Sequence, residues 1–182
     1  MITNSRKSNL GKRLLHIFFI LFMQNVFAQK NDTIHFEKIY FESSPCDGIC
    51  SAYELQIDNS KTIHLLANMV YKQNEIFPIM DKRKLGYYIG TLSDSIYTSL
   101  LNGLKSSNIY TENFDKTSIT FGNQKIKIIV YFNNKQKRVY TEEPYGNLEK
   151  LIETFFKICE KSHLKKTRKK FIFDGPKREY KN

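Results

Sequence analysis

The sequence contains no tryptophan, and it has only three cysteines and four prolines in 182 residues. Three cysteines are too few for the densely cross-linked scaffold of a small secreted domain. No apolar run approaches the roughly 20 residues of a membrane span, which excludes a polytopic membrane protein. Glycine-rich phosphate loops, Gly-x-Ser-x-Gly turns and His-Glu-x-x-His pairs are also missing from the sequence, so these signatures of nucleotide binding, serine hydrolysis and zinc catalysis do not apply.

The composition supports a folded domain with one core. Hydrophobic residues make up 41% of the chain and aromatic residues 14%, which excludes disorder over the whole length. The net charge of +11 invites comparison with nucleic-acid-binding proteins, but it is unevenly distributed. Residues 1–28 carry +4, residues 157–182 carry +7, and residues 29–156 are balanced. The basic excess therefore belongs to the two ends.

The first 28 residues have the three-part order of a secretory signal peptide. A basic segment precedes a short apolar segment at residues 14–23, and Val26 and Ala28 are spaced as at a cleavage site. We therefore expect cleavage after Ala28 and a mature chain exported to the periplasm or the cell surface, with no membrane span left after cleavage. An uncleaved signal anchor is the alternative, and the short apolar segment disfavours it.

Alternating and β-branched residues predict a series of strands after a short lead-in at residues 29–35. The expected strands are 34–41, 53–58, 62–66, 69–76, 85–91, 117–121, 125–132 and 137–140. Residues 125–132 are apolar on both faces, which is typical of a central strand.

Two segments have the apolar spacing of amphipathic helices. The first covers residues 94–105 with Ser93 as its N-cap, and the second begins at Asn147 as its cap and ends near residue 161. The order of strands, helix, strands and helix predicts a single α+β domain over residues 36–160. We expect an antiparallel sheet of hairpins with both helices packed on one face.

The segment between the first two expected strands carries the most specific motif, Cys-Asp-Gly-Ile-Cys-Ser-Ala-Tyr. It resembles the domain-of-unknown-function family 6438 of small exported bacterial proteins, whose hallmark is Cys-x-Gly-x-Cys-Pro-x-Tyr entering a β-hairpin. Ser51 stands where the family usually has proline. The resemblance extends over about residues 36–160 and implies a fold and a compartment, but no activity. The matching residues are Cys46, Gly48, Cys50 and Tyr53.

Cys46 and Cys50 can form a disulfide in an oxidising compartment if the loop between them turns, and Gly48 would permit an unusual backbone there. Two unpaired thiols are the alternative, which export disfavours. A redox-active pair of cysteines is a second alternative. The spacing is one residue longer than in Cys-x-x-Cys, however, and no helix follows to lower a thiolate pKa.

The remaining candidates for a metal or catalytic site are scattered. His35, His64 and His163 show no ligand spacing, and structural zinc needs about four ligands. Cys159 lies on the apolar stripe of the last expected helix, where a small buried hydrophobe is the usual role. We therefore predict no catalytic, cofactor-binding or metal-binding residues.

The last segment, residues 161–182, is expected to be a basic, solvated tail. Export argues against nucleic acid as its partner, and no base-stacking module accompanies it. Contact with an anionic envelope component is the alternative. The residues that would make this contact are Lys165, Lys166, Arg168, Lys169 and Lys170.

Together these features predict an exported, non-catalytic binding or interaction domain, without a cofactor and monomeric, whose partner is an unknown protein or an anionic envelope component. Two rivals stay open: a small hydrolase-like secreted enzyme with a site scattered in sequence, and an inhibitor or scaffold that presents an aromatic sheet face. A concave pocket with several converging titratable groups would favour the enzyme.

Overall fold

The computed structural model describes residues 35–72, 75–111, 114, 122–161 and 163–175. The predicted signal peptide and the strand expected at residues 117–121 lie outside these residues. No helix within the described ranges is long and apolar enough to cross a membrane.

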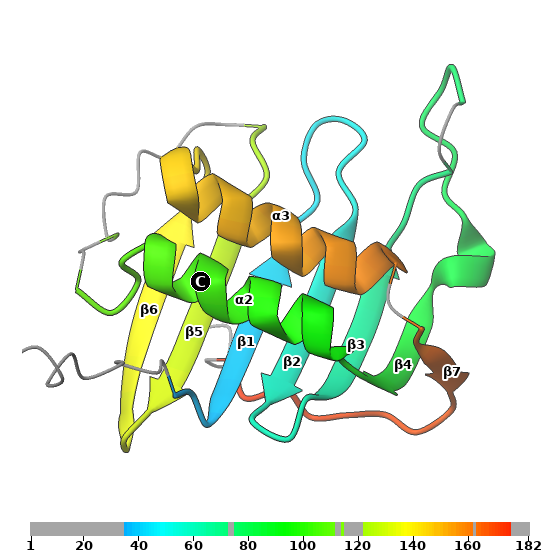
Figure 1. Ribbon diagram of the computed structural model, residues 1–182. Helices are drawn as coiled ribbons and strands as arrows, with labels where there is room; N and C mark the ends of the chain where they lie inside the picture. Colours follow the sequence, from blue (N-terminus) through cyan, green and yellow to red (C-terminus); the bar gives the residue numbers. More distant parts are fainter. Residues whose placement is uncertain (1–34, 73–74, 112–113, 115–121, 162, 176–182) are drawn as a thin grey trace, which may run out of the picture. The chain divides into compact units, whose positions relative to one another are not determined.

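Seven strands form one antiparallel sheet in the order β6-β5-β1-β2-β3-β4-β7 (Figure 1). The strands are β1 (Lys38–Ser43), β2 (Ala52–Asp58), β3 (Thr62–Met69), β4 (Gly86–Thr91), β5 (Ile126–Phe132), β6 (Lys135–Thr141) and β7 (Lys165–Thr167). Each neighbouring pair is antiparallel. β5 lies between β6 and β1, so the prediction that residues 125–132 form an interior strand is confirmed.

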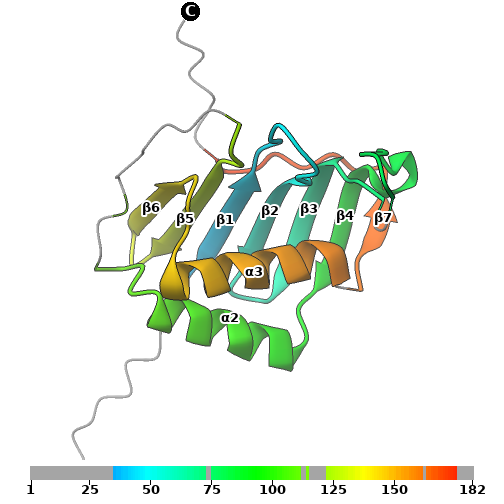
Figure 2. The same cartoon turned by 90° about the horizontal axis from the view of Figure 1, so that it is seen from above.

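Two helices, α2 (Asp94–Ser106) and α3 (Gly146–Lys161), pack side by side on one face of the sheet (Figure 2). Ser93 caps α2 as expected, because its hydroxyl accepts a hydrogen bond from the Ile96 amide at 3.4 Å. Asn147 lies inside the first turn of α3 instead of capping it, and its side chain donates to the Ser106 carbonyl at 3.0 Å. The α+β prediction, with both helices on one face, is confirmed.

The core lies between the sheet and the helices. Strand alternation places Phe41 and Leu55 on the helix side, where they are fully buried. The Phe41 ring stacks on Phe155 of α3 with a centroid distance of 4.8 Å, and Phe156 meets the same ring edge-on. These aromatic contacts fix α3 across the middle of the sheet.

Residues 70–72 and 75–76 do not continue as the strand that the pattern of residues 69–76 predicted. β3 ends at Met69, and the chain turns into a protruding hairpin, which we define as residues 70–72 and 75–80. Its base is closed by hydrogen bonds from the Lys72 amide to the Ile79 carbonyl and from the Asp81 amide to the Val70 carbonyl, at 2.9 and 2.7 Å. The prediction fails because β4 pairs with β3 only as far as Ala67, so the hairpin has no strand of the sheet beside it.

The basic segment that follows α3 is part of the fold, contrary to the expectation of a solvated tail. Residues 165–167 form β7 and pair with residues 87–89 of β4. The chain then crosses the sheet face opposite the helices (Figure 2), where Phe171 stacks on His64 at 4.2 Å. Asp174 forms an ion pair with Lys38 of β1. The prediction fails because the aromatic residues within the basic run find partners on the sheet, so the folded unit continues past residue 160.

Candidate functional site

The disulfide between Cys46 and Cys50 is present, and the Cα atoms lie 5.5 Å apart, an ordinary separation for a disulfide. The backbone of Gly48 is not left-handed. The glycine that this loop requires is Gly122, whose φ is +90° and whose carbonyl accepts from the Asp47 amide at 3.0 Å. A Cβ at Gly122 would lie 2.9 Å from an Asp47 carboxylate oxygen, which that side chain can move to relieve, but a φ of +90° is strained for any residue other than glycine.

One side chain from a distant part of the sequence holds both ends of the disulfide loop, which we define as residues 44–51. The Gln124 amide nitrogen donates to the Ser44 carbonyl at 3.0 Å and to the Ser51 carbonyl at 2.8 Å. Ser43 adds a second link, because its hydroxyl accepts from the Tyr53 amide and donates to the Ser51 carbonyl. The loop is therefore fixed by covalent and polar bonds at both ends.

Tyr53 is the motif residue that enters the core. Its ring lies on the helix side of β2, where it is 3% exposed and meets Phe156 edge-on at a centroid distance of 6.3 Å. Burial raises the pKa of its hydroxyl to about 12. The motif thus connects the surface disulfide to the core through one buried phenol.

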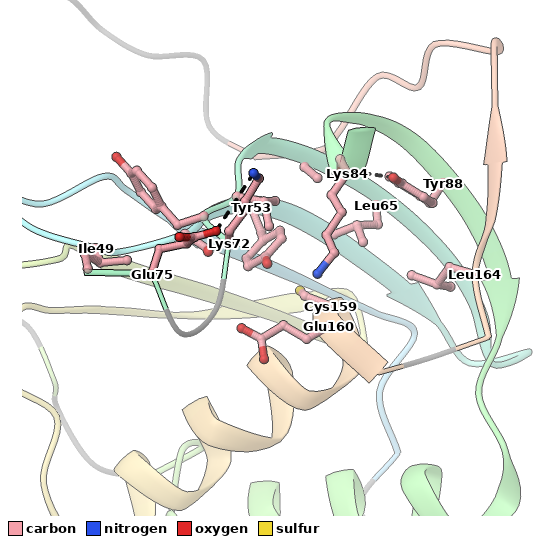
Figure 3. A pocket seen from close by; sticks show the side chains of 14 residues that line it. Ile49, Tyr53, Leu65, Lys72, Glu75, Lys84, Tyr88, Cys159, Glu160 and Leu164 are labelled. Atoms are coloured by element: carbon pink, nitrogen blue, oxygen red, sulfur yellow. Dashed lines mark hydrogen bonds and ion pairs between the residues drawn. The ribbon is translucent and has the colours of Figure 1, made fainter. Parts of the chain in front are cut away.

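Beside Tyr53 lies a cavity of about 760 Å³ (Figure 3). It is bounded by strands β2 to β4, the end of α3, the disulfide loop and the protruding hairpin. Its lining consists of Ile49, Ser51, Tyr53, Leu65, Ala67, Val70, Tyr71, Lys72, Glu75, Lys84, Tyr88, Cys159, Glu160 and Leu164. The segment from Ile49 to Tyr53 forms one wall of this cavity, so the motif and the cavity belong together.

The cavity has an apolar floor and charged groups of both signs near its mouth. Lys72 and Glu75 of the protruding hairpin face each other at 3.9 Å, and the Tyr88 hydroxyl donates to the Lys84 carbonyl at 2.9 Å (Figure 3). Burial raises the pKa of the Tyr88 hydroxyl, and it raises the pKa of the Cys159 thiol well above its usual value. The cavity thus offers protonated thiol and phenol groups at neutral pH.

The other predicted site residues lie apart from the cavity. His64 lies beneath Phe171 on the opposite face of the sheet, and the exposed bases from Lys165 to Lys170 lie at and beyond β7. Within the described ranges, no three His, Cys, Asp or Glu residues are grouped so that they could hold a metal ion. Sequence reasoning missed Gln124 and Gly122. The only local signal for either residue was the Gly-Asn-Gln turn composition of residues 122–124.

The comparisons with known proteins identify a family but no characterised relative. No curated protein matches the sequence significantly. The family described as "Domain of unknown function (DUF6438)" matches residues 37–160, which is more than half of the chain and includes the disulfide loop, Tyr53 and both helices. The chain therefore belongs to the DUF6438 family.

Proposed function

We propose that the chain is an exported, non-catalytic binding domain that holds part of a partner protein in the cavity beside the disulfide loop. One observation carries the proposal: the motif segment from Ile49 to Tyr53 forms a wall of this cavity, and that wall is fixed by a disulfide and by Gln124. A pre-formed wall lowers the entropy lost on binding. Export agrees with the disulfide, since disulfides persist in oxidising compartments.

Several titratable groups line the cavity, as the enzyme alternative requires, but their chemistry favours binding over catalysis. A nucleophilic thiol or a general acid–base group needs a pKa near neutrality, but burial moves the pKa values of Cys159 and Tyr53 away from it. Lys72 and Glu75 form an ion pair with each other. These groups suit recognition better than proton transfer.

The cavity favours an apolar or aromatic side chain of a partner, flanked by charged residues. Its volume lies within the range of about 300–1,000 Å³ that is typical of ligand sites. Leu65 and Ala67 on the floor exclude water without offering polar partners, whereas Lys84 and Glu160 can pair with charges at either side of an inserted group.

The proposal is tested by affinity capture from envelope extracts on immobilised protein. The wild type should retain a defined component that the I49D variant and the C46S/C50S variant lose, because each changes the same cavity wall. I172D is the matched control, since Ile172 is also an exposed apolar residue but lies outside the cavity lining. Equal capture by I49D and the wild type would refute the proposal.

The enzyme alternative is tested on the same protein preparation. Turnover of ester or peptide substrates by the wild type that disappears in E160Q, while circular dichroism shows an unchanged fold, would replace the binding domain with a hydrolase. We expect no turnover above that of the E160Q variant.

A further inference from the structure

The protruding hairpin ends in apolar side chains that the rest of the described chain leaves exposed. Ile76 is 92% exposed and Phe77 is 74% exposed, and they are followed by Pro78, Ile79 and Met80, which are also exposed. Single exposed apolar residues are common on protein surfaces, but a continuous run at the end of a projection marks an interaction site. Ile79 and Met80 lie on the arm that returns to the base of the hairpin, and we call residues 76–80 together the hairpin tip.

The same edge of the sheet carries a dense group of bases. The short helix η1 (Lys82–Lys84) follows the hairpin tip directly, and β7 lies against β4 next to it (Figure 1). The Lys166 ammonium donates to the Arg83 carbonyl at 2.9 Å, which joins the two basic segments although they are far apart in sequence. We call this group the basic edge. It consists of the exposed residues Lys82, Arg83, Lys84, Lys165, Lys166, Arg168, Lys169 and Lys170.

We propose that the hairpin tip and the basic edge form a docking surface for a lipid bilayer with anionic headgroups. An exposed base near such a surface contributes about 1 kcal/mol of attraction, and a few apolar side chains inserted at the headgroup level add affinity that depends on buried area. Neither the bases nor the apolar side chains alone would give stable attachment to a bilayer, and here both lie at the same edge of the sheet.

The combination of chemistries selects the bilayer over other anionic partners. Nucleic acid would satisfy the bases, but it would take up apolar side chains such as Ile76 only at the cost of unstacking its own bases. The bilayer offers both, because its headgroup region borders on acyl chains. Long lysine side chains also adapt to a fluid layer of headgroups, which needs no fixed pairing geometry.

A single fluorescent reporter tests the insertion of the hairpin tip. The chain has no tryptophan, so F77W introduces the only indole. Vesicles of phosphatidylcholine with phosphatidylglycerol should shift its emission to the blue, and pure phosphatidylcholine vesicles should not. Y145W is the matched control, because Tyr145 is 73% exposed but follows β6, the edge strand at the opposite end of the sheet from β7. The control should show no shift.

Charge reversal tests the basic edge in the F77W background. K82E with K169E should weaken binding to the anionic vesicles at least about tenfold. K135E with R138E changes the net charge by the same amount on β6 and should leave the affinity nearly unchanged. Added salt should weaken the binding.

Three results would show that the hairpin tip and the basic edge are not the docking surface, and a fourth would overturn the choice of an anionic bilayer. The F77W emission could stay unchanged with anionic vesicles, both tryptophan variants could shift alike, or the two charge-reversed pairs could lose equal affinity. The last result would mean that net charge acts without a defined surface. A shift with neutral vesicles of the same size would remove the requirement for anionic headgroups.

Discussion

Two walls of one cavity are built in opposite ways. The disulfide loop is closed by a covalent bond and held at both ends by Gln124, a residue more than 70 positions away in sequence. The protruding hairpin has no strand of the sheet beside it, and it exposes Ile76 and Phe77. The hairpin is closed at its base by backbone hydrogen bonds from Lys72 and Asp81, whereas a covalent bond and the side chain of Gln124 fix the disulfide loop. We call the disulfide loop the rigid wall of the cavity and the protruding hairpin the adaptable wall.

The largest predicted effect is a loss of stability at high pH, which acts through Tyr53 in the wall formed by the motif segment. Burial raises the pKa of Tyr53 from 10.0 to about 12, so the folded state favours the protonated phenol. The resulting stability is complete below pH 10 and is lost as the pH rises through about 12, by an amount of about 2–3 kcal/mol. Urea unfolding of the wild type and Y53F at several alkaline pH values checks this. Burial also raises the pKa of Tyr110 to about 12, so Y110F measures that separate contribution.

Removal of the disulfide should loosen the rigid wall. The chain-entropy relation gives a loss of about 2 kcal/mol in the free energy of unfolding for so short a loop. C46S/C50S compared with the wild type in urea measures it, and addition of reductant to the wild type should reproduce the loss. C159S is the control, because Cys159 is a free cysteine, and its unfolding should not respond to reductant differently from the wild type. Unchanged stability of C46S/C50S would show that the polar bonds alone fix the loop.

The side-chain amide of Gln124 should matter somewhat less. Q124A removes two partly buried hydrogen bonds to carbonyl groups, and we expect a loss of about 1 kcal/mol. Gln136 on β6 is exposed, so Q136A should change the free energy of unfolding by less than about 0.5 kcal/mol. Equal effects of the two substitutions would contradict the role given to Gln124.

The adaptable wall should tolerate substitution almost without cost. I76S with F77S should change stability by less than about 0.5 kcal/mol, because both side chains are exposed. Thermal unfolding measures this directly. A large loss would mean that the hairpin tip packs against the domain, and the contrast between the two walls would disappear.

The sequence was sufficient for those parts of the fold that depend on local pattern. Alternation marked β2, and the apolar stripes marked both helices, because burial on one face imposes a period on the residues. The disulfide followed from a motif. The cavity could not be predicted from the sequence, because its walls come from segments that meet only after the sheet has formed.

β7 shows why other parts of the fold could not be predicted from the sequence. Its residues, Lys165 to Thr167, have neither the alternation nor the β-branched content of a typical strand. They pair because β4 offers an unoccupied edge, and the edge exists only in the assembled sheet. The carbonyl partners of Gln124 are likewise set by tertiary structure, so no local spacing indicates them.

The position of β7 has a consequence for how the chain is made. The edge of β4 is covered by the segment that follows α3 in the chain, so it stays open until that segment has been made and has paired. An open edge that carries Tyr87 and Ile89 is a template for pairing with other chains. β7 therefore protects the edge of β4, and a chain truncated before Lys165 would be prone to aggregate through that edge.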